Sequence, residues 1–142
     1  MSRSIVLATE VEASPEQAYD AVSSTTGLAA FWTPTVDGAY QVGGTLRLGF
    51  EAAPVDLEMT VAVLDPPRRV QWECAGPWPH WGGTLVEWTI HPGETTTVAL
   101  SHQGWSEEQS DIGLGSVAMT WALVLLALKS YLATGKPAPA LA

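Results

Sequence analysis

The segment Ser110–Gly135, SDIGLGSVAMTWALVLLALKSYLATG, has the composition and the end signals of one long helix. Ser110 or Asp111 can cap its first turn, because a short side-chain oxygen accepts a free backbone N–H there. Gly135 can take the left-handed conformation that ends a helix, and Pro137 prevents continuation. The sequence therefore predicts a closing helix around which the rest of the chain is organised.

The predicted helix is apolar on more than one side. At about 100° per residue, its main apolar face holds Leu114, Val117, Ala118, Trp121, Leu125, Leu128 and Leu132. The opposite face is apolar in its middle, which suggests contact with a second copy of the chain through Met119, Leu123 and Leu126. The dense apolar run is shorter than the roughly 18 residues that a membrane span needs. We therefore favour a helix buried against a sheet and no membrane span.

Bulk composition indicates one folded domain over residues 1–135, followed by a loose tail over residues 136–142. Of the 142 residues, 46% are hydrophobic and 15% are charged, which disfavours disorder. A net charge of −9 without a basic stripe excludes nucleic-acid binding. Cys74 is alone, and only four successive apolar residues precede Thr9, too few for a signal peptide. We therefore expect a cytoplasmic protein.

The order of the remaining elements predicts an α+β fold. Alternating residues in Ser4–Glu12 indicate a strand, Ser14–Gln17 begins a helix with a capping box, and Thr26–Trp32 forms a second short helix. Alternation then predicts strands at Val36–Val42, Thr45–Glu51, Asp56–Leu64, Arg69–Ala75, Thr84–His91 and Thr95–His102. Consecutive strands joined by short turns form an antiparallel sheet. We expect a curved sheet of six to seven strands wrapped around the C-terminal helix.

Several segments resemble a known superfamily in both their residues and their order. They are VEASPEQAY at 11–19, LAAFWTP at 28–34, VGG at 42–44, DPPRRVQW at 65–72, WGGT at 81–84, LSHQGW at 100–105 and the closing helix. Together they resemble the START-like (SRPBCC) helix-grip superfamily, in particular the branch named after the activator of Hsp90 ATPase. The resemblance spans nearly the whole chain. It implies the fold and leaves the function open, because this fold hosts ligand carriers, cyclases and chaperone activators.

The resemblance implies a cavity between the sheet and the long helix that takes a small apolar molecule. Large apolar walls with few polar groups are typical of such pockets. The candidate ligand-binding residues are Trp32, Phe50, Met59, Trp72, Trp88, His102, Trp105, Trp121 and Leu125. The alternative is that these side chains simply fill the core.

Among the polar residues, His102 is the strongest candidate for a chemical role. Strand alternation points it the same way as Val98 and Leu100, towards the helix. With an ordinary pKa near 6.5, it could bind or protonate a ligand. We favour a structural histidine hydrogen-bonded within the corner Ser101–Trp105, because no acid or nucleophile is evidently placed to orient it.

Other chemistry-bearing residues give weaker signals. Trp78, His80 and Trp81 lie in a Pro/Gly-rich loop that could gate a pocket or meet a partner, or Trp81 could plug the sheet edge. Cys74 on an inward row is typical of an inert buried thiol. The histidines lack ligand spacing, and no P-loop or dinucleotide motif is present, so we predict no metal and no cofactor.

Three classes of function fit these observations. The leading hypothesis is a binding protein for a small apolar or aromatic molecule, with catalysis unproven. The second is an enzyme of the cyclase, dehydratase or hydrolase type acting on an aromatic or polyketide-like substrate. The third is an interaction protein that modulates a chaperone ATPase, as the family name implies.

Overall fold

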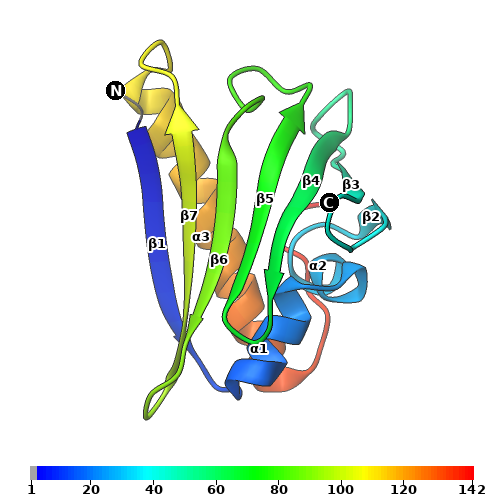
Figure 1. The fold of residues 1–142 in the computed structure, drawn as a ribbon, viewed down its shortest axis with the longest axis vertical. Helices are drawn as coiled ribbons and strands as arrows, with labels where there is room; N and C mark the ends of the chain where they lie inside the picture. The colour runs from blue at the N-terminus through cyan, green and yellow to red at the C-terminus, as the bar shows by residue number, and fades with distance from the viewer. Residues whose placement is uncertain (1–2) are drawn as a thin grey trace.

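A seven-stranded antiparallel sheet curves around the long helix α3 in the computed structural model, which describes residues 3–142 (Figure 1). The predicted α+β helix-grip architecture is confirmed. Its elements in chain order are β1 (Arg3–Val11), α1 (Pro15–Val22), α2 (Thr25–Phe31), β2 (Thr35–Gly38), β3 (Thr45–Gly49), β4 (Leu57–Asp65), β5 (Arg69–Gly76), β6 (Leu85–His91), β7 (Thr96–Trp105) and α3 (Asp111–Thr134).

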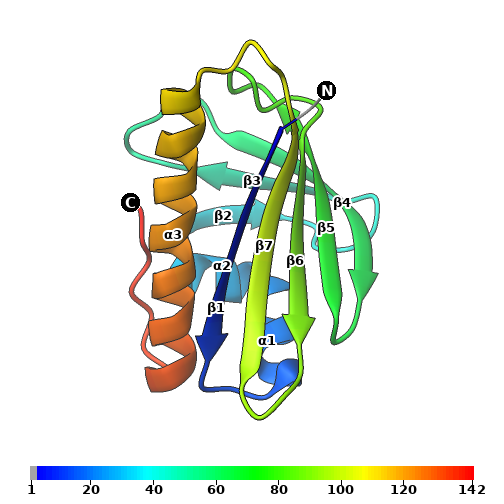
Figure 2. The same ribbon diagram turned by 90° about the vertical axis from the view of Figure 1, so that its left-hand side faces the viewer.

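The sheet follows the order β1-β7-β6-β5-β4-β3-β2. Strands β2 to β6 each pair with the next strand along the chain, so β2 to β7 form a meander. Strand β1 pairs with β7, with Leu7 opposite Leu100. This pairing brings the start of the chain beside the strand that leads into α3. Figure 2 shows α3 running along one face of the sheet.

Helix α3 buries one stripe, formed by Trp121, Val124, Leu125 and Leu128, in the core. The inward row of the sheet supplies large partners for it, including the fully buried Trp72, Trp88 and Leu100. The predicted inner face was too wide, since Leu114, Val117, Ala118 and Leu132 are only half-buried. The opposite side is open, and Met119 there is 72% exposed.

The whole of α3 is long and apolar enough to cross a membrane by length and composition alone. In this fold the inner stripe of α3 packs against the sheet, so the helix serves as a core helix of the domain.

The predicted helix-end signals are confirmed in detail. The Ser14 hydroxyl accepts the Gln17 N–H at 3.1 Å, and the Gln17 side chain accepts the Ser14 N–H at 2.9 Å. Ser110, and not Asp111, caps α3 by accepting the Gly113 N–H at 2.9 Å. Gly135 ends that helix with φ of 73°. These local interactions fix where α1 and α3 begin and end.

Two strand ends differ from the prediction by three residues or more. The weak strand predicted to run to Val42 ends at Gly38, where φ is +121° and a Cβ would lie 2.1 Å from the Thr45 carbonyl oxygen. Only glycine fits such a close backbone approach. The last strand runs on to Trp105, because it pairs with β1 as far as Arg3.

Residues 136–142 are bound to the domain, contrary to the expected loose tail. The N–H groups of Ala138, Ala140 and Leu141 donate to the carbonyls of Ala30, Phe31 and Trp32 at 2.9 to 3.0 Å. This segment thereby runs from the end of α3 back along α2. Figure 2 shows this segment beside α3.

Two helical glycines provide a matched test of how closely the elements pack. A methyl group at Gly27 in α2 would lie 1.9 Å from the Ala21 carbonyl oxygen, whereas nothing lies within 4 Å of one at Gly115 in α3. We expect Gly27→Ala to lower the free energy of unfolding by about 1–3 kcal/mol or more, because α1 and α2 must separate. Gly115→Ala should raise it by about 0.5–1 kcal/mol. Urea unfolding measures both, and shifts of equal sign would contradict the packing.

Candidate functional site

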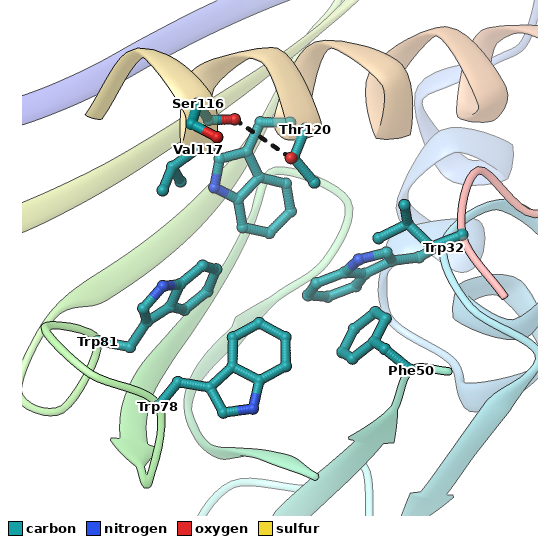
Figure 3. Close-up of a pocket in the computed structure, with 9 residues that line it drawn as sticks. Trp32, Phe50, Trp78, Trp81, Ser116, Val117 and Thr120 are labelled. Carbon is teal, nitrogen blue, oxygen red and sulfur yellow. Dashed lines mark hydrogen bonds between the residues drawn. The ribbon is translucent and has the colours of Figure 1, made fainter. Parts of the chain in front are cut away.

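A cavity of about 200 Å³ opens between α3, the end of α2 and the β5–β6 loop. Figure 3 shows its lining side chains converging from separate parts of the chain. These residues are Trp32, Phe50, Trp78, Trp81, Ser116, Val117, Thr120, Trp121 and Leu141. None of them is ionisable, so the lining offers ring faces, apolar contacts and two hydroxyls.

Five aromatic rings form a closed circuit around this cavity, which we call the aromatic circuit. Successive ring centroids lie 6.0 Å apart for Trp32 and Phe50, 5.1 Å for Phe50 and Trp78, and 5.3 Å for Trp78 and Trp81. The circuit closes through Trp121, at 6.3 Å from Trp81 and 5.0 Å from Trp32. Each spacing lies in the range at which aromatic pairs attract one another.

Buried core residues contact two rings of the aromatic circuit. The Trp32 ring stacks on Trp72 at 5.8 Å with 10° between the planes, and Trp121 meets the edge of Trp88 at 6.0 Å. The Trp72 indole N–H in turn donates to the Tyr40 hydroxyl at 2.9 Å. Trp32 and Trp121 therefore belong to the core and to the cavity wall at once.

A chain of hydrogen bonds ties two walls of the circuit together. The Trp121 indole N–H donates to His102 Nδ1 at 3.1 Å. Indole nitrogen only donates, so Nδ1 must accept and the neutral ring carries its proton on Nε2. That N–H donates to Thr84 Oγ1 at 2.8 Å, and the Thr84 hydroxyl donates to the Trp81 carbonyl at 2.6 Å. The chain links α3, β7 and the β5–β6 loop.

His102 has no free proton-accepting atom. Its side chain is fully buried, and burial lowers the pKa of His102 to about 3. It is therefore neutral at pH 7, with both ring nitrogens already bonded. This geometry favours the structural interpretation, but the partners differ from those predicted. The ring points towards α3, as strand alternation predicts, so Trp121 on α3 and Thr84 in the β5–β6 loop are its partners in place of the corner Ser101–Trp105.

Cys74 lies beside this chain, with its Sγ 4.0 Å from His102 Nε2. Burial raises the pKa of the Cys74 thiol to about 11, so the thiol stays protonated and is a poor nucleophile. Across residues 3–142, no group of three His, Cys, Asp or Glu side chains is close enough to hold a metal ion.

The predicted ligand-binding residues divide into two groups. Trp32, Phe50 and Trp121 line the cavity. The other six are buried in the core, since the middle of the sheet packs directly on α3: Met59, Trp72, Trp88, His102, Trp105 and Leu125. Alternation identifies which side chains face inward and does not tell how far each lies from the opening.

Sequence reasoning left out most of the cavity rim. Trp78 and Trp81 line the cavity. Their Pro/Gly-rich loop predicts a gate or a partner contact, or for Trp81 a plug at the sheet edge, and two tryptophans in such a loop are a usable signal of a cavity wall. Ser116 and Thr120 lie one turn apart on α3, with the Thr120 hydroxyl donating to the Ser116 carbonyl at 3.2 Å (Figure 3). No sequence pattern identifies Leu141 as a lining residue, because its position depends on how the C-terminal segment binds along α2.

The family model of the activator of Hsp90 ATPase homolog 1-like proteins matches residues 12–133. The chain belongs to this family. No curated protein matches it.

Solved structures place this Hsp90-activator-like chain among proteins of the same fold. It is similar to the Aha1 dimer from Colwellia psychrerythraea, with 31% identity and a TM-score of 0.83, covering 94% of this chain and 98% of that one. It also resembles MLL2253 from Mesorhizobium loti, at 20% identity and TM-score 0.78, covering 92% and 97%. CalU16 from Micromonospora echinospora has 20% identity and TM-score 0.72, covering 94% and 78%. At 20% identity, the proteins from Mesorhizobium loti and Micromonospora echinospora show only that they have the same fold as this chain.

The buried neutral state of His102 predicts a specific loss of stability in acid. Below about pH 6.5 the unfolded chain binds a proton on this imidazole, while the folded chain does so only near pH 3. The free energy of unfolding should therefore fall by up to about 1.4 kcal/mol for each pH unit between these values. A glutamine amide can also accept from Trp121 and donate to Thr84, so His102→Gln should show a shallower decline in urea melts from pH 7 to pH 4. Equal slopes would contradict a neutral folded-state imidazole.

Proposed function

We propose that this chain binds a small apolar or aromatic molecule in the cavity beside α3. The observation that carries this proposal is the aromatic circuit, which surrounds about 200 Å³ of space with five rings. A dry cavity of about 150 Å³ is large enough to hold benzene. The ligand is therefore expected to insert one ring, two fused rings or a group of similar size.

Binding is better supported than catalysis. General acid–base chemistry needs a titratable group within hydrogen-bond reach of the reacting atom. The lining residues have none, and the buried His102 is occupied on both nitrogens. The cavity is also small for a whole polyketide-like substrate, which weakens the enzyme hypothesis. A chaperone-modulating role is suggested by the family name, and the cytoplasmic location stays a prediction.

Binding can be tested by titrating indole into the parent protein and into a variant in which the cavity-lining residue Trp78 is substituted. Trp78 stands on the loop and is only half-buried, so its removal should leave the core intact. We expect Trp78→Ala to weaken indole binding by about 1 kcal/mol, several-fold in Kd, through loss of one aromatic contact. Isothermal titration and the ligand-induced rise in Tm measure the effect.

The matched control is Val6→Ala, which alters an exposed side chain on β1 outside the cavity lining and should bind like the parent. Absence of any heat or Tm shift for indole and for naphthalene-sized compounds would refute the proposed cavity. If the Trp78→Ala variant and the parent bind indole equally tightly, Trp78 is not part of the binding site.

We also propose that two copies of the chain pair through the outer face of α3. Ile112, Met119, Leu123 and Leu126 are 87%, 72%, 54% and 58% exposed. Three of them recur every seven residues, and Leu123 follows Met119 by four, which is the spacing of a helix–helix seam. The relative from Colwellia psychrerythraea with 31% identity is a dimer, which supports the same assembly here.

A charge in the middle of this seam should separate the copies. Leu123→Glu would place a carboxylate in an apolar interface, so we expect a monomer where the parent has twice the chain mass. Light scattering after size exclusion measures the mass, and Val6→Glu, on an exposed position of β1, is the control. A monomeric parent at about 100 μM, or a dimeric Leu123→Glu variant, would reject the pairing.

A further inference from the structure

We propose that the aromatic circuit takes a compact organic cation, namely an alkylated ammonium group such as a trimethylammonium head. The inference rests on the proposed function, because it names the ligand class of the same cavity. Three features of the molecule support this ligand class: the geometry of the rings, the other groups that line the cavity, and the charge of the chain.

The spacing of the rings suits a cation placed between them. Their successive centroids are 5.0 to 6.3 Å apart around a closed path. If they were evenly spaced, each centroid would lie about 5 Å from that centre, inside the roughly 6 Å range of cation–π attraction. Four of the five are tryptophans, whose rings bind cations best among the aromatic side chains.

No cationic side chain lines the cavity to pair with an anion. The indole N–H groups of Trp78 and Trp121 point to the Val55 carbonyl and to His102, at 3.0 and 3.1 Å. The Thr120 hydroxyl donates to the Ser116 carbonyl. A carboxylate or phosphate placed here would lose its water without gaining a charged partner, which is costly.

None of the residues that line the cavity is cationic, and the arginines have acidic partners elsewhere. Each arginine forms an ion pair with an aspartate or glutamate: Arg3 with Asp111, Arg47 with Asp37 and Glu58, Arg68 with Asp65, and Arg69 with Glu87. On α3 the lysine is Lys129, nine residues beyond Thr120 and hence about 14 Å further along the helix axis. A bound cation would meet no like charge among the lining residues.

Charge distinguishes a cation from a neutral ring of the same shape. The faces of aromatic rings carry the negative part of their quadrupole, so several faces around one point stabilise a positive charge there. A trimethylammonium group needs no hydrogen-bond acceptor, because methyl groups enclose its nitrogen. The chain's net charge of −9 also raises the local concentration of cations.

The test compares trimethylphenylammonium with tert-butylbenzene, two molecules of nearly equal shape that differ by one positive charge. We expect the cation to bind the parent protein at least about fivefold more tightly, measured by tryptophan fluorescence and titration calorimetry. The preference should persist in 0.5 M NaCl, where attraction to a distant acidic surface is screened to a few ångströms (about 3–5 Å).

Substitutions of individual rings test whether the aromatic circuit causes the preference for the cation. Phe50→Leu and Trp78→Leu each keep an apolar side chain and remove one π face, so cation binding should fall by about threefold or more relative to tert-butylbenzene binding. Val117→Ala changes a lining residue that has no ring and should keep the parent's preference. Retained tert-butylbenzene binding also reports that each variant still has an intact cavity.

Each outcome has a defined meaning. Equal binding of the two probes, or tighter binding of tert-butylbenzene, would overturn the cation assignment and leave the proposed function standing. Binding of neither probe would count against both. A preference that disappears in salt, or that survives both ring substitutions, would assign it to the acidic surface and overturn the role of the aromatic circuit.

Discussion

The cavity depends on the hydrogen-bond chain from Trp121 through His102 and Thr84 to the Trp81 carbonyl. Each donor in it is used once, and the tautomer of His102 is fixed by the indole that approaches Nδ1. Removing one member would leave a buried polar group unpaired, at a cost of about 1–3 kcal/mol. A histidine without evident chemistry of its own thus sets the distance between the helix wall and the loop wall of the site.

Helix α3 carries two apolar stripes on opposite sides. Its inner stripe around Trp121 and Leu125 covers the sheet, and its outer stripe around Met119 and Leu123 remains exposed. This explains why only Asp111 and Lys129 are charged along its whole length. The rim residues Ser116 and Thr120 lie between these stripes, so they are the polar break between the buried face and the open one.

Local patterns in the sequence were sufficient for the elements and insufficient for the cavity. Ser14, Gln17, Ser110 and Gly135 fix helix ends through interactions with near neighbours, which can be read from the chain. Trp72 and Trp32 are both inward-facing, yet one lies in the core and the other on the cavity wall. That difference depends on where the β5–β6 loop and the C-terminal segment lie, and contacts distant in sequence decide both positions.

The aromatic circuit stays open because three of its five rings are held by contacts outside the cavity. Protein interiors normally close around empty space, since unfilled contacts are lost dispersion energy. Here Trp32 is stacked on Trp72, Trp78 is bonded to the Val55 carbonyl, and Trp121 is bonded to His102. Collapse into the cavity would break these contacts. A site kept open in this way is preorganised, so less conformational entropy is lost when a ligand enters.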